Sequence, residues 1–159
     1  MKSPFPDNEL QRLAAVRATG LIGTPSEERI DRFTRLAQRM FDMPIALVNL
    51  VDSDKVWVKS CQGLDVDDVP REITFCAHAI MGDEVLVVMD ATKDERFAEN
   101  PLVADEPHIH FYAGCPIVAE NGMRLGTLCL LDHQPRIFST QDRELLRDLA
   151  ETVTAELIA

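Results

Sequence analysis

Four cysteines are the side chains in this sequence best suited to nucleophilic chemistry. They are Cys61, Cys76, Cys115 and Cys129. No two of them form a C-x-x-C pair, so their spacing does not predict a metal site. Cys76 lies near the start of a predicted short helix, where the helix dipole can lower the pKa of a thiol. One interpretation is therefore thiol chemistry around Cys76, and the other is four buried, inert thiols.

The four histidines, His78, His108, His110 and His133, are the other candidate metal ligands. His108 and His110 could place both rings on one face of a strand, because alternate residues share a face. The sequence has no H-E-x-x-H motif to accompany them. We predict no metal site and interpret these side chains mainly as solvent-facing loop histidines.

Motifs of the common enzyme classes are also missing. There is no G-x-S-x-G nucleophile turn and no phosphate-binding G-x-x-x-x-G-K. The aspartates of the predicted turns, Asp52, Asp54, Asp67 and Asp68, resemble solvated charges more than catalytic pairs. We therefore predict that the chain is not an enzyme.

The segment from Asp83 to Glu106 is strongly acidic. It carries eight acidic side chains against Lys93 and Arg96, a net charge of −6. A bound phosphate needs cations or oriented N–H groups, and such a field opposes it. The segment therefore disfavours a cyclic nucleotide as ligand, unless Arg96 points inward.

Hydrophobic periodicity places these residues on a mixed series of helices and strands. Helices are predicted over 7–18, from 25 to Pro44, over 75–81 and from 140 onward, and strands over 45–51, 55–61, 85–89, 111–119 and 123–131. Residues 90–110 are predicted to form a long loop with a single helical turn around 95–98. A loop of this length is usually functional or mobile.

Several local signals position the helix ends and helix faces. Thr24 and Glu27 have the spacing of a capping box, with Pro25 at the first helical position, and Ser139 with Asp142 repeats the capping pattern. The first helix is expected to bury a face formed by Leu10, Leu13 and Ala14, and Thr74 is expected to cap the helix over 75–81. The stripes of the two long helices are Ile30, Phe33, Ala37, Met40 and Phe41, and Leu145, Leu149, Val153 and Leu157.

The strand over 45–51 is apolar except for Asn49, which is typical of a central strand covered on both faces. The next strand alternates, with Val56 and Val58 on one face and Lys55, Trp57 and Lys59 on the more exposed one. Residues 65–72 are interpreted as a charged loop.

Asn121-Gly122 between two apolar segments predicts a hairpin with a two-residue turn. In the resulting register Cys115 is opposite Leu128, and Gly114 is opposite Cys129. Cys115 and Cys129 then point to opposite faces of the sheet and cannot form a disulfide.

The order of these elements predicts an α+β fold with a central antiparallel sheet. The long terminal helices are expected to cover one face. The short helix and the long acidic loop are left for the other face, where they would enclose a concave ligand site.

Composition narrows the function classes. The chain has 159 residues, 46% apolar and 27% charged, with a net charge of −11, which fits one globular domain over 1–159. Because no cluster of Lys and Arg accompanies this acidity, we expect no nucleic-acid or membrane binding. No signal peptide or apolar span is visible, so we expect a cytoplasmic protein.

Several segments together resemble the GAF domains of bacterial signalling proteins, especially those found with histidine kinases and diguanylate cyclases. The matching segments are TPSEERIDRFTRLA, PIALVNLVD, WVKSCQGL, FCAHAI, DERFAENPLV, IHFYAGCPI, GTLCLLD and DRELLRDLA. They cover a core of about 13–150 in the expected order. The resemblance implies a sheet of five or six antiparallel strands, with the terminal helices on one face and the pocket on the other.

The resemblance leaves the ligand and any cofactor open, since GAF domains bind cyclic nucleotides, bilins, haem or small metabolites, or only dimerise. The N-K-x-x-x-F-x-x-x-D pattern of cyclic GMP binders is absent. Bilin carriers commonly have Cys-His, whereas this chain has Cys76-Ala77-His78.

The enzyme alternative is a thiol-dependent reductase of free methionine sulfoxide, with Cys61, Cys76 and Cys115 converging on the pocket. The glycine- and cysteine-rich stretch of that enzyme family is missing.

The resulting hypothesis is a non-catalytic sensory domain that binds a small neutral or cationic ligand. The candidate ligand-binding residues are Trp57, Phe75, Cys76, His78, Asp90, Arg96, His110, Tyr112 and Cys115. The terminal helices are expected to form a homodimer, and a kinase or cyclase is the expected effector. A pure interaction domain with a collapsed pocket is the other non-catalytic possibility.

Overall fold

Six strands form one antiparallel sheet in the computed structural model, which describes residues 3–158. The elements are α1 (Glu9–Ala18), α2 (Glu28–Phe41), β1 (Ile45–Val51), β2 (Lys55–Gln62), β3 (Asp68–Pro70), η1 (Arg71–Ile73), α3 (Cys76–Ala79), β4 (Leu86–Val88), η2 (Ala91–Lys93), α4 (Pro101–Ala104), β5 (Phe111–Val118), β6 (Arg124–Asp132) and α5 (Thr140–Leu157). The strand order is β3-β2-β1-β6-β5-β4. The predicted α+β fold class is confirmed.

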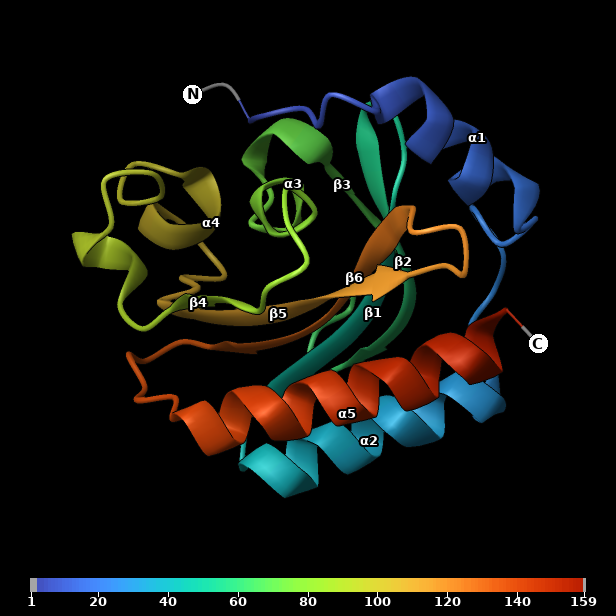
Figure 1. Ribbon diagram of the computed structural model, residues 1–159. Helices are drawn as coiled ribbons and strands as arrows, with labels where there is room; N and C mark the ends of the chain where they lie inside the picture. The colour runs from blue at the N-terminus through green and yellow to red at the C-terminus, as the bar shows by residue number, and fades with distance from the viewer. Residues whose placement is uncertain (1–2, 159) are drawn as a thin grey trace.

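The sheet separates two apolar cores because alternate side chains of each strand point to opposite faces. In β1, all of whose residues are buried, Val48 and Leu50 face one core, while Leu47 and Val51 face the other. Helices α2 and α5 lie side by side below the sheet, and α3 and α4 lie above it (Figure 1). The upper layer is made of short pieces, which leaves room for a cavity.

Helix α5 begins as predicted. Ser139 and Asp142 form a complete capping box, each side chain accepting from the other residue's backbone N–H. The buried stripe contains Leu146, Leu149 and Val153, whereas Leu145 is 38% exposed.

Helix α2 starts later than predicted, and the prediction of Thr24 as its cap is wrong. The helix begins at Glu28, and no side chain caps it. The polar groups of Thr24 and Glu27 contact the ammonium group of Lys59 instead, at 2.7 Å and 2.6 Å. The prediction that Lys59 lies on an exposed strand face is wrong too: it is 3% exposed, at a bulge where β2 pairs with β1.

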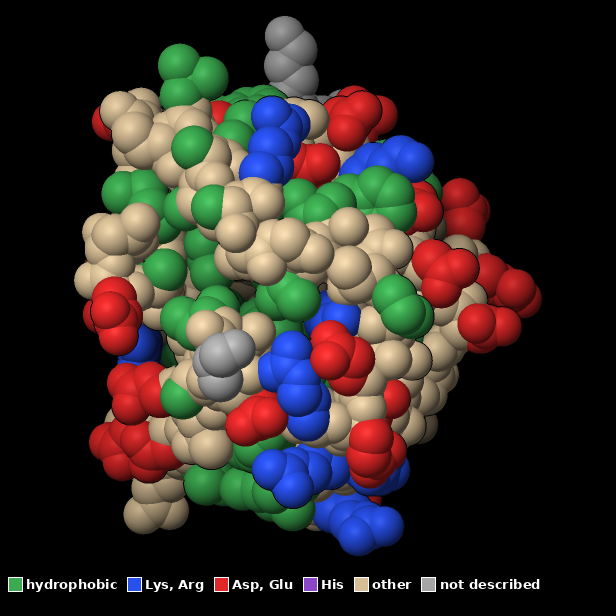
Figure 2. All heavy atoms as spheres, turned by 90° about the vertical axis from the view of Figure 1, so that its right-hand side faces the viewer, with side chains coloured by type: hydrophobic (Ala, Val, Ile, Leu, Met, Phe, Trp, Pro, Cys, Tyr) green, Lys and Arg blue, Asp and Glu red, His purple; other side chains and the backbone are tan. Residues whose placement is uncertain are grey.

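Helix α1 occupies a different place from α2 and α5, at the end of the sheet beside the hairpin (Figure 1). The prediction of its buried face is wrong, since Leu10 is 81% exposed and Arg12 is buried. Arg12 donates to both carboxylate oxygens of Glu9 and to the carbonyl of Arg124, and Val16 is buried in the apolar core, so polar and apolar contacts together hold the helix. Figure 2 shows this end of the molecule, where acidic and basic side chains are interspersed.

The irregular segments contain more structure than the sequence indicated. Residues 65–72, predicted as a loop, contain the edge strand β3, which pairs with β2. The predicted turn near 95–98 is present, with the Ala98 N–H donating to the Asp94 carbonyl. The additional helix α4 was not predicted. It has the Asn100 side chain as its cap and Pro101 in its first turn.

The β5–β6 hairpin has the predicted register, with Cys115 opposite Leu128 and Gly114 opposite Cys129. The turn differs, because Ala119 pairs with Met123 and leaves three loop residues. Gly122 is the last of them, with φ of 83°, and a bulge near Val118 restores the register.

Within residues 3–158, none of the helices combines the length and hydrophobicity needed to cross a bilayer.

Candidate functional site

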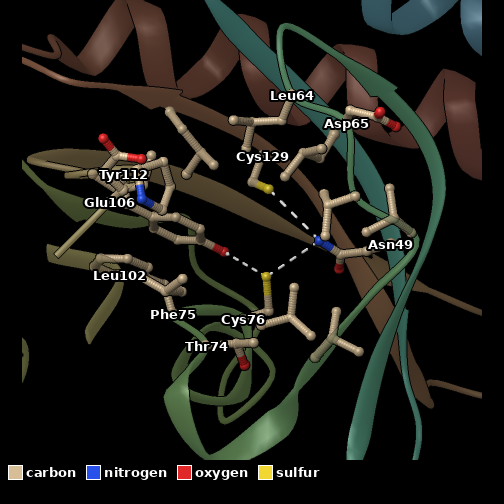
Figure 3. A pocket seen from close by; sticks show the side chains of 18 residues that line it. Asn49, Leu64, Asp65, Thr74, Phe75, Cys76, Leu102, Glu106, Tyr112 and Cys129 are labelled. Atoms are coloured by element: carbon tan, nitrogen blue, oxygen red, sulfur yellow. Dashed lines mark hydrogen bonds between the residues drawn. The ribbon is translucent and has the colours of Figure 1, made fainter. Parts of the chain in front are cut away.

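A cavity of about 380 Å³ lies between the upper face of the sheet, α3, α4 and the segment that connects β2 to β3. Figure 3 shows it from close by. It is lined by Leu47, Asn49, Val56, Val58, Leu64, Asp65, Val66, Val69, Thr74, Phe75, Cys76, Leu102, Glu106, Pro107, Ile109, Tyr112, Cys129 and Leu131. Most of these side chains are apolar, which is typical of a small-molecule site.

A cluster of polar side chains lies within this apolar surface. The amide nitrogen of Asn49 donates to the Cys76 sulfur at 3.3 Å and to the Cys129 sulfur at 3.7 Å (Figure 3). The Tyr112 hydroxyl donates to the Cys76 sulfur at 3.5 Å. The Thr127 hydroxyl is 2.9 Å from the Asn49 oxygen and 3.3 Å from the Cys76 sulfur. Cys76 is therefore the common acceptor of the cluster.

The sheet register brings most of this cluster together. Asn49 is opposite Thr127, and Leu47 is opposite Cys129, in the β1–β6 ladder. Cys76 is the first residue of α3, and Thr74 holds the start of this helix. The Thr74 hydroxyl accepts from the Ala77 N–H at 3.3 Å and donates to the Arg71 carbonyl at 2.8 Å.

Aromatic packing fixes the side of the cavity next to Cys76. Phe75 stacks on Tyr112 with ring centroids 4.9 Å apart and packs at a tilt against Phe97, with ring centroids 4.5 Å apart. Both Phe75 and Tyr112 are almost fully buried. The tyrosine ring is thus held where its hydroxyl reaches the thiol.

The hydrogen bonds give the two thiols different acidities. Bonds from Cys129, Thr127, Tyr112 and Asn49 outweigh burial and lower the pKa of Cys76 to about 6. The hydrogen bond to Cys76, together with burial, raises the pKa of Cys129 well above its usual value. Burial and the neighbouring Cys76 likewise raise the pKa of Tyr112. The site therefore favours one thiolate, at Cys76, beside a protonated thiol and phenol.

The charged groups of the cavity are acidic. Asp65 and Glu106 line it and are exposed to solvent, and none of the described lining residues is Lys or Arg. Such a surface attracts a cation and repels an anion.

Among residues 3–158, no three His, Cys, Asp or Glu side chains are grouped so that they could hold a metal ion.

A family model for the GAF domain matches residues 25–157. The chain belongs to the GAF domain family. Among curated proteins, a cyclic di-GMP phosphodiesterase of Pseudomonas aeruginosa is 39% identical over 155 residues, which is 97% of this chain and 26% of that protein. The chain thus spans about a quarter of the length of this relative.

Solved structures share the GAF fold at low sequence identity. The GAF domain of a phosphoenolpyruvate-protein phosphotransferase from Coxiella burnetii has a TM-score of 0.69 and 17% identity, covering 94% of this chain and 92% of that one. The type II free methionine-R-sulfoxide reductase of Thermoplasma acidophilum has a TM-score of 0.68 and 11% identity, covering 92% and 94%. The GAF domain region of a protein from Geobacter sulfurreducens has a TM-score of 0.66 and 19% identity, covering 93% of this chain and 96% of that one.

Three of the nine sequence-predicted site residues line the cavity of this GAF domain: Phe75, Cys76 and Tyr112. Cys115 lies on the opposite face of the sheet, in the core under α5, where burial raises its pKa to about 11. Trp57 borders a separate polar hollow of about 580 Å³ next to Lys59.

The other four predicted residues lie outside the cavity. His78 packs edge-on against Phe97, and burial lowers its pKa. Arg96 is exposed and pairs with Asp94 at 2.8 Å. Asp90 accepts from the backbone N–H of Thr92 as the cap of η2, and His110 lies beside His108 with ring centroids 6.3 Å apart.

Sequence reasoning missed two central residues, Asn49 and Cys129, although both left a signal. Asn49 is the single polar residue in an otherwise apolar central strand. Cys129 is opposite Gly114, which shares its face with Tyr112, so the predicted register already placed Cys129 on the pocket face. The lining residues from 64–69 and 102–109 left no comparable signal, because their positions depend on loop geometry.

Proposed function

We propose that this GAF domain is a non-catalytic sensory domain of a signalling protein, and that its cavity binds a small neutral or cationic molecule. The observation that carries the proposal is an apolar cavity of about 380 Å³ that contains a polar cluster and no cationic lining residue among those described. This volume falls in the lower part of the range of about 300–1,000 Å³ for small-molecule sites.

The walls and the polar groups define the chemistry of the ligand. Phe75, Leu102 and Ile109 would contact an apolar body, while Tyr112 and Asn49 would orient a polar group. The carboxylates of Asp65 and Glu106 favour an amino or other cationic group over a phosphate.

A chain of contacts leads from the cavity to α1. Thr74, which lines the cavity, donates to the Arg71 carbonyl from both its backbone N–H and its hydroxyl. The Arg71 guanidinium in turn forms an ion pair with Glu9 of α1 and donates to the Asp52 carbonyl. A ligand that favours one position of Thr74 would therefore shift the populations of α1 positions.

Exposed apolar side chains on α2 and on the C-terminal helix α5 support a homodimer through this lower helical layer. Leu36 and Met40 of α2 and Leu145 of α5 are 43%, 39% and 38% exposed, respectively. Covering such side chains with a second copy would remove apolar surface from water. The signalling output we propose is a cyclic di-GMP phosphodiesterase, kinase or cyclase, the first suggested by the relative from Pseudomonas aeruginosa.

Filling the cavity tests the proposal. Leu102 is half-buried at the cavity wall, so Leu102→Trp should occupy the ligand space, whereas Ile137→Trp introduces the same residue at an 87% exposed position outside the cavity. A set of small neutral and cationic metabolites is first screened by thermal shift. For each hit, we expect affinity at least about tenfold weaker in Leu102→Trp, a change of about 1.4 kcal/mol, and unchanged in Ile137→Trp. Equal binding by both variants, or no hit at all, would contradict the proposal.

A second candidate function, reduction of free methionine sulfoxide, is supported by the position of Cys76 on the cavity wall, where hydrogen bonds lower its pKa. Cys115 lies on the other face of the sheet and takes no part in this version of the hypothesis. The test is turnover of free methionine sulfoxide with a thiol reductant. Turnover that disappears in Cys76→Ser would establish the reductase, and no turnover in the wild type would remove it.

A further inference from the structure

The two cavity cysteines form a pair whose arrangement the sensory function does not use. Both sulfurs accept from the same amide nitrogen of Asn49, at 3.3 Å and 3.7 Å. Both side chains line the same cavity, and their environments lower the pKa of Cys76 and raise the pKa of Cys129. In Figure 3 the two sulfurs face one another within the cavity.

The pair differs from the other two cysteines in access and chemistry. Cys61 donates to the Leu64 carbonyl at 3.0 Å, and burial raises its pKa. Cys115 is packed under α5, and burial raises its pKa as well. Only Cys76 combines a stabilised thiolate with a position on the wall of an apolar cavity, next to a second thiol.

We propose that Cys76 and Cys129 are an oxidation site, at which an organic hydroperoxide entering the cavity converts the two thiols to a reversible disulfide. The apolar walls suit an alkyl or aryl hydroperoxide, and the sulfur that must react with it faces the cavity.

The reaction proceeds in two balanced steps. The Cys76 thiolate attacks the terminal oxygen of the hydroperoxide and the O–O bond breaks, so that the OH group is transferred to sulfur as a sulfenic acid. The departing alkoxide takes a proton from water and leaves as an alcohol. The Cys129 sulfur then attacks the Cys76 sulfur, and the S–O bond breaks as the S–S bond forms. The hydroxide leaves with the Cys129 proton as water, and an external thiol reductant restores both thiols.

The neighbouring groups fit both steps. The hydroxyls of Tyr112 and Thr127 lie 3.5 Å and 3.3 Å from the Cys76 sulfur, where they can donate to an oxygen bound to it. Cys129 keeps its proton until the second step because its pKa is raised. The site thus contains an attacking thiolate, hydrogen-bond donors and a resolving thiol.

Oxidation of the two thiols would also change ligand binding, an effect that rests on the proposed sensory function. A disulfide would no longer accept from Asn49 as a thiolate does, so the amide would be free to bind a ligand group. Oxidation is measured without any ligand, so the failure of ligand binding and the failure of oxidation are separate results.

The experiment treats the reduced wild-type chain with cumene hydroperoxide, blocks the remaining thiols with iodoacetamide and measures the intact mass and the peptide map. We expect a loss of about 2 Da before blocking, a disulfide-linked peptide pair containing Cys76 and Cys129, and reversal by dithiothreitol. Of the four free cysteines, Cys61 and Cys115 should remain available to iodoacetamide after denaturation. An unchanged mass, or a disulfide that includes Cys61 or Cys115, would overturn the proposal.

Two variants separate the steps, and Cys115→Ser is the matched control outside the cavity. Cys129→Ser should stop at the sulfenic acid, detected as a dimedone adduct on Cys76. Cys76→Ser should oxidise at least about tenfold more slowly, since the thiolate is the nucleophile. Cys115→Ser should form the disulfide as the wild type does. A dimedone adduct on a residue other than Cys76, or oxidation of Cys76→Ser at the wild-type rate, would contradict attack by Cys76 followed by Cys129. If a variant does not fold, the peptide map of the wild type alone tests the disulfide.

Discussion

The hydroxyl group of Tyr112 lies over Gly114, two residues further along β5, in the space that a side chain at position 114 would occupy. A Cβ atom at Gly114 would be 2.1 Å from the Tyr112 hydroxyl oxygen and 2.5 Å from the ring carbon that bears it. The missing side chain of Gly114 therefore allows Tyr112 to reach Cys76 and complete the polar cluster.

The first prediction follows from this contact. Gly114→Ala should move the Tyr112 ring, break its bond to Cys76 and lower the free energy of unfolding by about 1–3 kcal/mol, the usual cost of overpacking. Gly82→Ala is the control, because no atom lies within 4 Å of a Cβ there. Urea denaturation measures both. Equal stability of the two variants would contradict the packing we describe.

The second prediction concerns the reactivity of Cys76 with pH. Its lowered pKa means that thiolate is present above about pH 6 and is lost as the pH falls through this value. The other groups facing it, Cys129 and Tyr112, stay protonated across this range because their pKa values are raised. We expect the rate of iodoacetamide labelling of Cys76 in the native protein to rise with a midpoint near pH 6.

Labelling of Cys115 is the internal comparison for that experiment. Its pKa is raised to about 11, so it should remain unlabelled in the native state up to pH 9. A Cys76 midpoint near the usual value of about 8.5, or faster labelling of Cys115, would show that the hydrogen bonds of the cluster do not stabilise a thiolate.

The third prediction concerns the buried ammonium group of Lys59. This group donates to the Thr24 hydroxyl and the Pro25 carbonyl. Lys59→Met should therefore lower the free energy of unfolding by about 1.5–3 kcal/mol, the range for hydrogen bonds to charged groups. Lys55→Met is the matched control, since Lys55 is 46% exposed. Thermal or urea unfolding of both variants measures the difference, and comparable losses would rule out a special role for Lys59.

The contact between Lys59 and Glu27 also makes the stability of the domain depend on pH. The hydrogen bond from Lys59, together with a smaller contribution from Arg29, lowers the pKa of Glu27 from 4.5 to about 2. The stabilisation is therefore complete above pH 4.5 and is lost as the pH falls toward 2. Unfolding measured over this window should show a shallower pH dependence in Lys59→Met than in the wild type, and identical slopes would contradict the assignment.

The fourth prediction concerns the attachment of α1. The Glu9 carboxylate binds both Arg12 and Arg71, which are each 1% exposed, and its removal leaves two buried guanidinium groups without their anion. Glu9→Ala should lower the free energy of unfolding by about 3–5 kcal/mol, and its amide hydrogen exchange should be faster in α1 than in α2. Glu28→Ala breaks only an exposed pair with Arg35 and should leave the free energy of unfolding nearly unchanged. Unchanged exchange in α1 would show that Glu9 does not hold the helix.

Much of the sheet could be predicted from the sequence because its signals are local. The apolar run of β1, the hairpin residues and the capping box of Ser139 each depend on neighbours within a few positions, and the hairpin register was correct. The resemblance to GAF domains supplied the arrangement of the layers.

Helix starts and site residues were harder because distant partners decide them. Thr24 and Glu27 have the spacing of a cap, yet a lysine 35 residues after Thr24 binds their polar groups. Similarly, Asp90 and Arg96 are used by their own neighbours, Thr92 and Asp94, and do not reach the cavity. Local polar contacts of this kind leave no periodic signal.

The central claim is that the cavity above the sheet binds a small molecule, and an amide chemical-shift titration tests it most directly. The isotope-labelled domain is titrated with the strongest hit from the thermal-shift screen. We predict saturable shifts centred on Asn49, Cys76 and Tyr112, little change at Cys115, and loss of these shifts in Leu102→Trp. Shifts centred on the α2–α5 face, or shifts that persist in Leu102→Trp, would contradict the account.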